Sequence, residues 1–260
     1  MDLGISGRVA LVTASTKGLG RATAEALASE GVHLAISSRN EAEARFVASE
    51  IAQRHGVRTL GVGCDVTQRA DLESLVAQVS DGLGPIDIAV PNTGGPPPGV
   101  FANLEDDQWA AGVESTLMNV VRLVRLVAPG MTERGWGRVV AITSTSAHEP
   151  ISGLTISNAL RPGLHGLVKD LSNDLAPMGV TVNAVAPGMH DTARLRHVAE
   201  ARNPEDPEAG LNAIAQTIPV GRLGRPDDFG KAVAFLCSEP AGFMSGTALF
   251  MDGGATRAAH

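Results

Sequence analysis

The sequence predicts an α/β protein with a doubly wound parallel sheet of about seven strands and helices on both faces. Short runs rich in β-branched residues alternate with longer amphipathic segments along the chain, a pattern typical of repeated β–α–β units. A glycine-rich segment separates the first strand candidate from the first helix candidate, where such folds bind nucleotides. The 260 residues suffice for one large core, so we expect a single domain over residues 1–260.

The individual elements follow from local patterns. Strands are expected at 9–12, 34–37, 59–63, 86–90, 138–142, 181–185 and 248–251. Helices are expected at 19–30, 41–55, 70–83, 106–134, 157–176 and 226–236. Asn40 is expected to cap the second helix, and Asp106 or Asp107 the long fourth helix, because short polar side chains accept from the free N–H groups of a first turn.

A long polar segment at 189–219 stands apart from this alternation. It is interrupted by prolines and has weak helical patterns at 192–201 and 207–217. Long connections in compact folds commonly act as lids or binding loops. We therefore expect a substrate-binding loop or lid at 189–219.

The composition argues against several classes of protein. A net charge of −7 does not suit a protein that follows nucleic-acid phosphates. No apolar run approaches the roughly 20 residues of a membrane span, and the first residues lack the pattern of a signal peptide. Cys64 and Cys237 form neither a metal motif nor a disulfide framework. We expect a cytoplasmic protein with a small-molecule substrate, no metal, and no nucleic-acid or membrane partner.

The segment 13–20 has the composition of a phosphate cradle. Gly18 and Gly20 let the backbone approach a diphosphate, and the following helix start supplies unpaired N–H groups and positive potential. Glycine pairs also occur in ordinary tight turns, but this position favours a nucleotide site in a Rossmann-type fold. The expected cofactor contacts here are Thr13, Ser15, Thr16, Lys17, Gly18, Leu19 and Gly20.

Residues after the next strands indicate which nucleotide is bound. Ser38 and Arg39 follow the second strand, where a fold that prefers NAD places an acid for the ribose hydroxyls. A hydroxyl and an arginine suit a 2′-phosphate instead, and Lys17 adds a second cation. The expected cofactor is therefore NADP(H). Further cofactor contacts are expected after the third and fourth strands, at Asp65, Val66, Asn92 and Gly94.

Several segments, in the correct order over nearly the whole chain, resemble the short-chain dehydrogenase/reductase family in its single-domain branch. TASTKGLG at 13–20 resembles the family's TGxxxGxG, with Ala14 in place of the first glycine, and CDV at 64–66 resembles its adenine motif. PNTG at 91–94 resembles its NNAG, and VNAVAPG at 182–188 its segment beside the nicotinamide. GRLGRPDD at 221–228 and GTALFMDGG at 246–254 resemble its last helix entry and last strand.

The resemblance, which extends to members similar to 3-oxoacyl-carrier-protein reductases, implies an oxidoreductase that uses NADP(H) on a carbonyl or alcohol of a small organic substrate. It adds Pro187, Gly188 and Thr192 to the expected cofactor contacts. It also implies a homo-oligomer, a tetramer or a dimer. The apolar run at 120–127, broader than one core-facing stripe, agrees with such an assembly.

The catalytic pattern of that family is largely replaced. The resemblance implies a tyrosine, a lysine four residues later, a serine thirteen residues before the tyrosine, and an asparagine from the preceding helix. Aligning LSNDLAPMGV at 171–180 without gaps puts Ser157, Arg161, Ser144 and Thr116, respectively, at these positions. The chain contains no tyrosine, so no local shift restores the phenol.

Ser157 and Arg161 still share one helix face, since they are four residues apart. A serine hydroxyl is far less acidic than a phenol with a pKa of about 10, whereas Arg161 can hold a ribose electrostatically and is expected to contact the cofactor. His148 and His190 are alternative proton sources, because histidine titrates near neutrality; the alternative for each is an ordinary surface histidine.

Three functions remain open from the sequence. The first is an NADP(H)-dependent oxidoreductase with a modified proton-transfer site, in which Ser144 stabilises the oxyanion. The second is an enzyme of the same fold with a non-redox reaction, such as dehydration or isomerisation. The third is a nucleotide-binding homologue without catalysis. Titration with NADPH followed by a carbonyl panel separates them, because binding without turnover favours the latter two.

Overall fold

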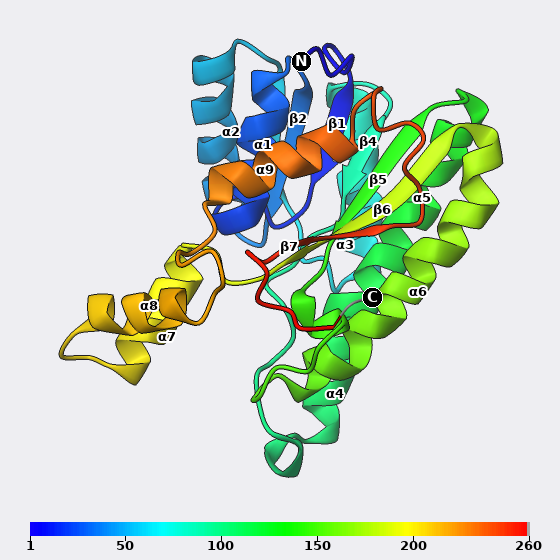
Figure 1. Cartoon of the computed structure of the whole chain (residues 1–260). Coiled ribbons are helices and arrows are strands. Elements are labelled where there is room, and N and C mark those ends of the chain that lie inside the picture. Colours follow the sequence, from blue (N-terminus) through cyan, green and yellow to red (C-terminus); the bar gives the residue numbers. More distant parts are fainter. Residues whose placement is uncertain (259–260) are drawn as a thin grey trace.

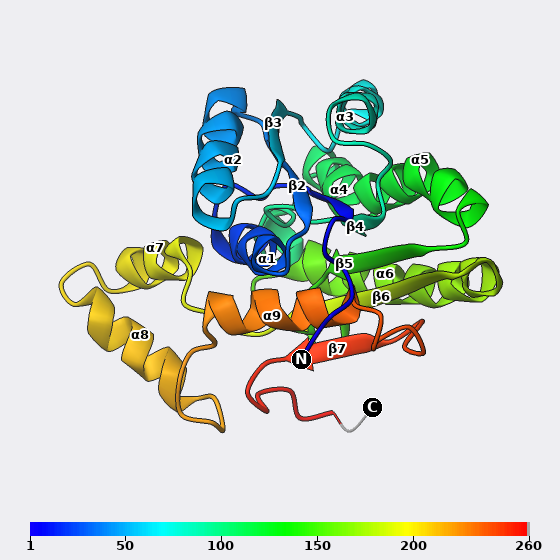
Figure 2. The same ribbon diagram turned by 90° about the horizontal axis from the view of Figure 1, so that it is seen from above.

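The computed structural model describes residues 1–258 and contains one parallel sheet with the strand order β3-β2-β1-β4-β5-β6-β7 (Figures 1 and 2). This arrangement confirms the predicted fold class. The strands are β1 Val9–Val12, β2 His33–Ser38, β3 Thr59–Gly63, β4 Ile88–Val90, β5 Gly137–Ile142, β6 Val180–Pro187 and β7 Ala248–Met251.

Helices cover both faces of the sheet (Figure 2). One face packs against α1 (Gly18–Ser29), α2 (Glu41–His55) and α9 (Pro226–Leu236). The other face packs against α3 (Arg69–Gly82), α5 (Asn119–Glu133) and α6 (Thr155–Leu175). The hairpin of α7 (Ala193–Arg202) and α8 (Pro207–Gln216) projects from the body after β6 (Figure 1).

The alternation of strand side chains explains the two cores. In β1, Ala10 and Val12 join the core under α1, whereas Val9 and Leu11 join the core under α3 and α5. Successive strand residues point to opposite faces, so a strand covered on both sides is mostly apolar. The exceptions are buried polar residues such as Asn183 in β6, whose Nδ2 donates to the Met244 oxygen at 2.8 Å.

Most predicted boundaries hold within one or two residues, with one larger difference in the long helix expected at 106–134. The structure divides it into α4 (Asp106–Val113), a π-helical turn (Glu114–Met118) and α5. Such a turn inserts one extra residue per turn, and π-turns often mark functional sites. Hydrophobic periodicity could not show it, because both sides of the turn remain helical.

Cap predictions were right at one helix and wrong at another. The Asn40 side chain accepts from the Glu43 backbone N–H at 3.2 Å, as expected. The cap of α4 is Glu105 rather than Asp106 or Asp107. The Glu105 backbone N–H donates to Gln108 Oε1 at 3.0 Å. Glu105 and Gln108 form a capping box, so the helix begins at Asp106, as expected, with its cap one residue earlier.

The loops that follow the strands gather at one edge of the sheet. Neighbouring strands are parallel, and the chain order reverses between β1 and β4. Ligands of open α/β sheets bind at the carboxyl edge beside such a reversal. Within residues 1–258, no helix has both the length and the hydropathy needed to cross a bilayer, and no group of three or more potential metal ligands comes together.

Candidate active site

The glycine-rich loop after β1 forms an open cradle at the start of α1. Gly18 has φ +59, in the left-handed region that favours glycine. A Cβ on Gly20 would lie 2.6 Å from both the Ala14 oxygen and Asn92 Nδ2. Lys17 precedes α1 and provides no side-chain cap, so the first N–H groups are available to an anion. The loop therefore fits a diphosphate.

Two predicted contact residues hold this loop in place. Asn92 Nδ2 donates to the backbone oxygens of Thr13 at 3.2 Å and Ala14 at 3.1 Å. Thr13 Oγ1 donates to the Asn92 oxygen at 2.8 Å and accepts from the Asn92 N–H at 2.7 Å. Ser15 Oγ similarly joins β1 to β2, since it donates to the Val12 oxygen and accepts from the Ser37 N–H.

Ala14, which replaces the first glycine of the family's loop motif, has φ +46 and is the one non-glycine residue with positive φ in residues 1–258. Side chains with a Cβ disfavour this region by roughly 1–2 kcal/mol. The loop therefore keeps the backbone shape of a glycine position at a cost in stability.

The residues after β2 surround the place expected for a 2′-phosphate. Ser38 Oγ donates to the Asn40 oxygen at 2.7 Å, and Arg39 is exposed with no ion pair to any described residue. Lys17 Nζ lies 3.6 Å from Glu43 Oε1, and its side chain is 76% exposed. Arg39 is thus the unpaired cation of this edge, while Glu43 partly neutralises Lys17.

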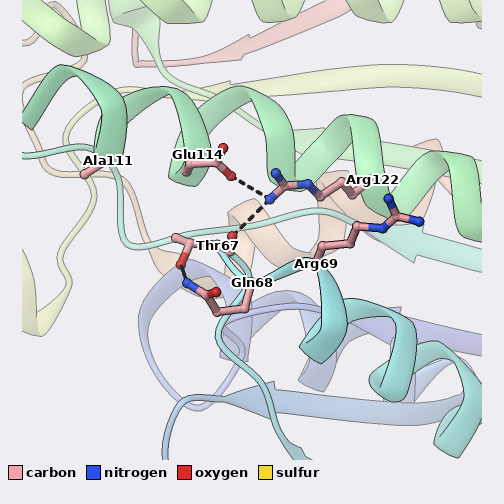
Figure 3. A pocket seen from close by; sticks show the side chains of 6 residues that line it. All are labelled: Thr67, Gln68, Arg69, Ala111, Glu114 and Arg122. Carbon is pink, nitrogen blue, oxygen red and sulfur yellow. Dashed lines mark hydrogen bonds and ion pairs between the residues drawn. The ribbon is translucent and has the colours of Figure 1, made fainter. Parts of the chain in front are cut away.

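The loop after β3 is held in place by an arginine of α5. Asp65 Oδ1 accepts from the N–H and the hydroxyl of Thr67 at 3.0 and 2.8 Å. Arg122 Nη1 donates to the Thr67 oxygen at 3.0 Å and to Glu114 Oε2 at 2.5 Å (Figure 3). A hollow of about 500 Å³ opens beside these residues. It adjoins the adenine motif of Asp65 and Val66 rather than the catalytic candidates.

Three serines come together where β5 ends. Ser157, on α6, is buried, and its Oγ lies 2.8 Å from Ser146 Oγ. Ser144 Oγ accepts from the Ser146 N–H at 3.1 Å. The sequence analysis singled out Ser144 and Ser157 but missed Ser146, whose only signal is its place in the run of hydroxyl side chains at 143–146. The structure therefore joins the two predicted residues through a third.

Arg161 lies one turn further along the same face of α6. It is 6% exposed, and its Nη1 donates to the Ile142 oxygen at 3.0 Å. Its Nε is buried without a hydrogen-bond partner in the described structure. Burial, together with the positive charge of Arg194, lowers the pKa of Arg161 to about 10, so the side chain remains a cation at neutral pH.

Thr116 lies in the π-turn, which packs against α6. Its Oγ1 is buried and has no hydrogen-bond partner among the described residues. Buried hydroxyls without a protein partner are commonly satisfied by ordered water. Thr116 thus offers a hydroxyl where the family resemblance placed an amide.

The segment after β6 closes the other side of the cradle. The Gly188 N–H donates to the Met251 oxygen at 3.0 Å, and a Cβ on Gly188 would lie 2.7 Å from Asp252 Cβ. Thr192 Oγ1 caps α7 by accepting from the Leu195 N–H at 3.3 Å. Its methyl carbon lies 3.9 Å from an ideal Cβ on Gly18. Thr192 therefore faces the glycine-rich loop, across the start of α1.

The histidines are placed differently from the sequence expectation. His190 is buried, with its ring edge-on to Phe229 at 5.3 Å, so it packs against α9 and is not a surface residue. His148 is half-buried, 5.0 Å from the Phe250 ring. His165, which the sequence did not single out, has Nε2 2.9 Å from Thr143 Oγ1. Burial, Arg161 and His148 lower the pKa of His165.

Comparisons with known proteins agree with this arrangement. A family model described as "Enoyl-(Acyl carrier protein) reductase" matches residues 13–256. Dehydrogenase/reductase SDR family member 4 of Oryctolagus cuniculus is 35% identical over 253 residues, which cover 96% of this chain and 94% of that protein. These matches span the glycine-rich loop, the serine cluster and the last strand together.

Solved structures show the same fold in detail. The L-sorbose reductase of Gluconobacter frateurii, complexed with NADPH and L-sorbose, is 32% identical with a TM-score of 0.96, covering 99% of this chain and 100% of that one. An NADPH-bound short-chain oxidoreductase of Pseudomonas aeruginosa PAO1, described as containing an atypical catalytic center, is 30% identical with a TM-score of 0.90. The match covers 98% of this chain and 99% of that one.

The parallel sheet, the cradle between β1 and α1 and the matches over nearly the whole length have one common explanation: this chain belongs to the short-chain dehydrogenase/reductase family of oxidoreductases.

Proposed function

We propose that this chain uses NADP(H) to interconvert a carbonyl and an alcohol on a small organic substrate, through a site in which Ser157 and Arg161 replace a tyrosine and a lysine. The observation that carries the proposal is their placement. Both are buried on one face of α6. Ser157 contacts Ser146 in the loop after β5, and Arg161 contacts the Ile142 oxygen at the end of β5. Ser157 and Arg161 thus share the face of α6 on which the tyrosine and the lysine would lie, although the residue types differ.

The cradle residues divide the cofactor among them. The loop from Thr13 to Gly20 and the start of α1 would hold the diphosphate, and Ser38 with Arg39 the 2′-phosphate. Asp65 and Val66 would hold the adenine. The remaining contacts, toward the nicotinamide half, are Asn92, Gly94, Arg161, Pro187, Gly188 and Thr192. NADPH supplies a hydride when bound.

The side chains near the β5 end would then handle the substrate oxygen. The Ser144 hydroxyl donates a hydrogen bond to that oxygen and stabilises negative charge on it. Arg161 holds the ribose hydroxyls and adds positive potential. The Ser157 hydroxyl, paired with Ser146, passes a proton through water, because its short side chain does not reach as far as a phenol. Segment 189–219, which contains α7 and α8, acts as the lid over this site.

One observation keeps a second function in view. The chain has no tyrosine, so a nucleotide-binding role without redox turnover, or a non-redox reaction on the same fold, needs no further change in the site. The Pseudomonas aeruginosa relative with an atypical catalytic center was crystallised with NADPH. That structure is an example of NADPH binding by a relative whose catalytic center is atypical.

The test combines binding with turnover. NADPH binding is measured by fluorescence titration, and NADPH oxidation is then followed with a panel of ketones, aldehydes and sugars. We expect tight binding and turnover of at least one panel member, with Ser144→Ala lowering kcat by about 100-fold or more. Ser157→Ala is expected to lower kcat with an unchanged KM. Tight binding with no turnover on any carbonyl would replace the proposal with the second function.

A gain-of-function variant addresses the replaced residues directly. Ser157→Tyr combined with Arg161→Lys restores the common pair, and the single variants serve as controls. If simple ketones are reduced only by the double variant, the natural site is specialised for another substrate. A wild-type chain that reduces simple ketones as fast as the double variant would show that the replacements have little mechanistic effect.

A further inference from the structure

Two arginines converge on the loop after β4. Arg194, the second residue of α7, donates from Nη1 to the Gly94 oxygen. Arg161 reaches the same loop from α6. A Cβ on Gly95 would lie 3.2 Å from Arg194 Nη1 and 3.9 Å from Arg161 Nη2. The two guanidinium groups therefore flank one backbone position, one from the lid and one from the body of the protein.

Neither guanidinium has a carboxylate partner among residues 1–258. By contrast Arg196, two residues further along α7, pairs with Asp191 at 2.7 Å and with Glu208 at 3.0 Å. Arg161 is also nearly fully buried, with an Nε that lacks a partner. A buried cation beside a second cation is costly unless an anion meets them. The arrangement is therefore incomplete without a negatively charged ligand.

The phosphates of the cofactor belong elsewhere, if the proposed function holds. The diphosphate cradle is at Gly18 and Gly20 after β1, and the 2′-phosphate place is at Arg39 after β2. The arginine pair instead lies after β4 and beside the end of β5, on the side of Ser144 and Ser157. The ribose that Arg161 would hold is uncharged, so the pair carries positive charge beyond what the nicotinamide half needs.

We propose that Arg194 and Arg161 together bind a carboxylate of the substrate, so that the enzyme acts on oxo acids and the corresponding hydroxy acids. A guanidinium presents two parallel N–H groups that match the two oxygens of a carboxylate. Arg161 keeps its bond to the Ile142 oxygen, and Arg194 exchanges the Gly94 oxygen for the ligand. Because Arg194 belongs to α7, carboxylate binding also draws the lid toward the serine cluster.

The experiment compares acids with their esters on the NADPH-bound enzyme. Acetoacetate and 2-oxobutanoate are each measured against the methyl ester of the same acid, for wild type and for Arg194→Leu. We expect wild type to favour the acids. Arg194→Leu should lower kcat/KM for the acids by on the order of 10–100-fold, because a charge-assisted hydrogen bond is lost. For the esters, kcat/KM should change by less than about 3-fold. The matched control is Arg222→Leu, which removes an exposed arginine outside the pair and should change neither.

A binding measurement keeps this test independent of turnover. Calorimetry with butyrate and methyl butyrate on the NADPH-bound protein should show binding of the acid to wild type, loss of that binding in Arg194→Leu, and an NADPH dissociation constant within about 2-fold of wild type. If no carbonyl is turned over, the proposed function fails, and butyrate binding still decides whether the arginine pair is a carboxylate site. Equal binding of acid and ester to wild type, or no acid binding, would overturn the carboxylate assignment. The assignment would also be overturned if Arg194→Leu bound NADPH about 10-fold more weakly and lowered kcat/KM equally for acids and esters. Arg194 would then bind the cofactor rather than the substrate.

Discussion

Gly20→Ala probes whether the cradle between β1 and α1 is as close-packed as the structure shows. The added methyl carbon would lie 2.6 Å from the Ala14 oxygen, 2.6 Å from Asn92 Nδ2 and 3.1 Å from Ser15 Cα. The first two atoms form a hydrogen bond with each other at 3.1 Å. The methyl group must therefore push the Asn92 side chain away from both backbone oxygens that it holds.

The magnitude follows from those contacts. Two hydrogen bonds are disturbed, each with a net value of about 0.5–1.5 kcal/mol, so the free energy of unfolding should fall by about 1–3 kcal/mol. Overpacking of a rigid backbone gives the same range. NADPH affinity should fall as well, because the displaced loop carries the diphosphate contacts.

Urea unfolding and fluorescence titration with NADPH measure the two effects. Gly163→Ala is the matched control: Gly163 lies on α6, and an added Cβ would have no atom within 4 Å. That variant should be more stable by about 0.5–1 kcal/mol, because alanine favours a helix over glycine, and its NADPH affinity should not change. Unaltered stability and affinity in Gly20→Ala would refute the close-packed cradle and the role of Asn92 in holding it.

Three further predictions follow from other parts of the site. Arg39→Asp should weaken NADPH binding by at least about 10-fold and strengthen NADH binding, because a carboxylate repels a 2′-phosphate and accepts from ribose hydroxyls; equal affinities of the wild type for both cofactors would contradict the role of Arg39. Ala14→Gly should raise the free energy of unfolding by about 0.5–1 kcal/mol, the relief of positive φ less the entropy of glycine, and lower stability would contradict it. Burial lowers the pKa of His165, so the unfolded chain binds the proton more readily and stability is lost as pH falls below about 6.5. His165→Gln should reduce the loss of stability between about pH 7 and 5, with a substitution of the exposed His197 to Gln as the control. An unchanged slope in His165→Gln would contradict the lowered pKa of the half-buried His165 imidazole.

The sequence predicted those features that depend on neighbours along the chain. Strands buried on both faces give short runs of mostly apolar residues, and Asn40 caps the helix that it precedes. The cradle at Gly18 and Gly20 was predictable for the same reason, since one turn joins one strand to one helix. The fold class could thus be predicted from local patterns alone.

Features that depend on distant contacts were not predictable. Ser146 meets Ser157 across 11 positions, and Arg194 meets Gly94 across 100. The sequence left His190 as either a proton source or a surface histidine, and packing against Phe229 buries it. The π-turn at Thr116 leaves no periodic trace, because helix continues on both sides. In each case the deciding partner is set by tertiary packing rather than by spacing.

One measurement tests directly whether this site transfers a hydride from NADPH although serine and arginine stand in place of tyrosine and lysine. NADPH carrying deuterium at the transferred position is incubated with excess wild-type enzyme and the carbonyl panel, including the oxo acids, and the alcohol products are analysed by mass spectrometry. We expect wild type to form an alcohol one mass unit heavier than the unlabelled alcohol, and Ser144→Ala to form much less of it. Saturating NADPH binding without deuterium in any product would contradict this expectation.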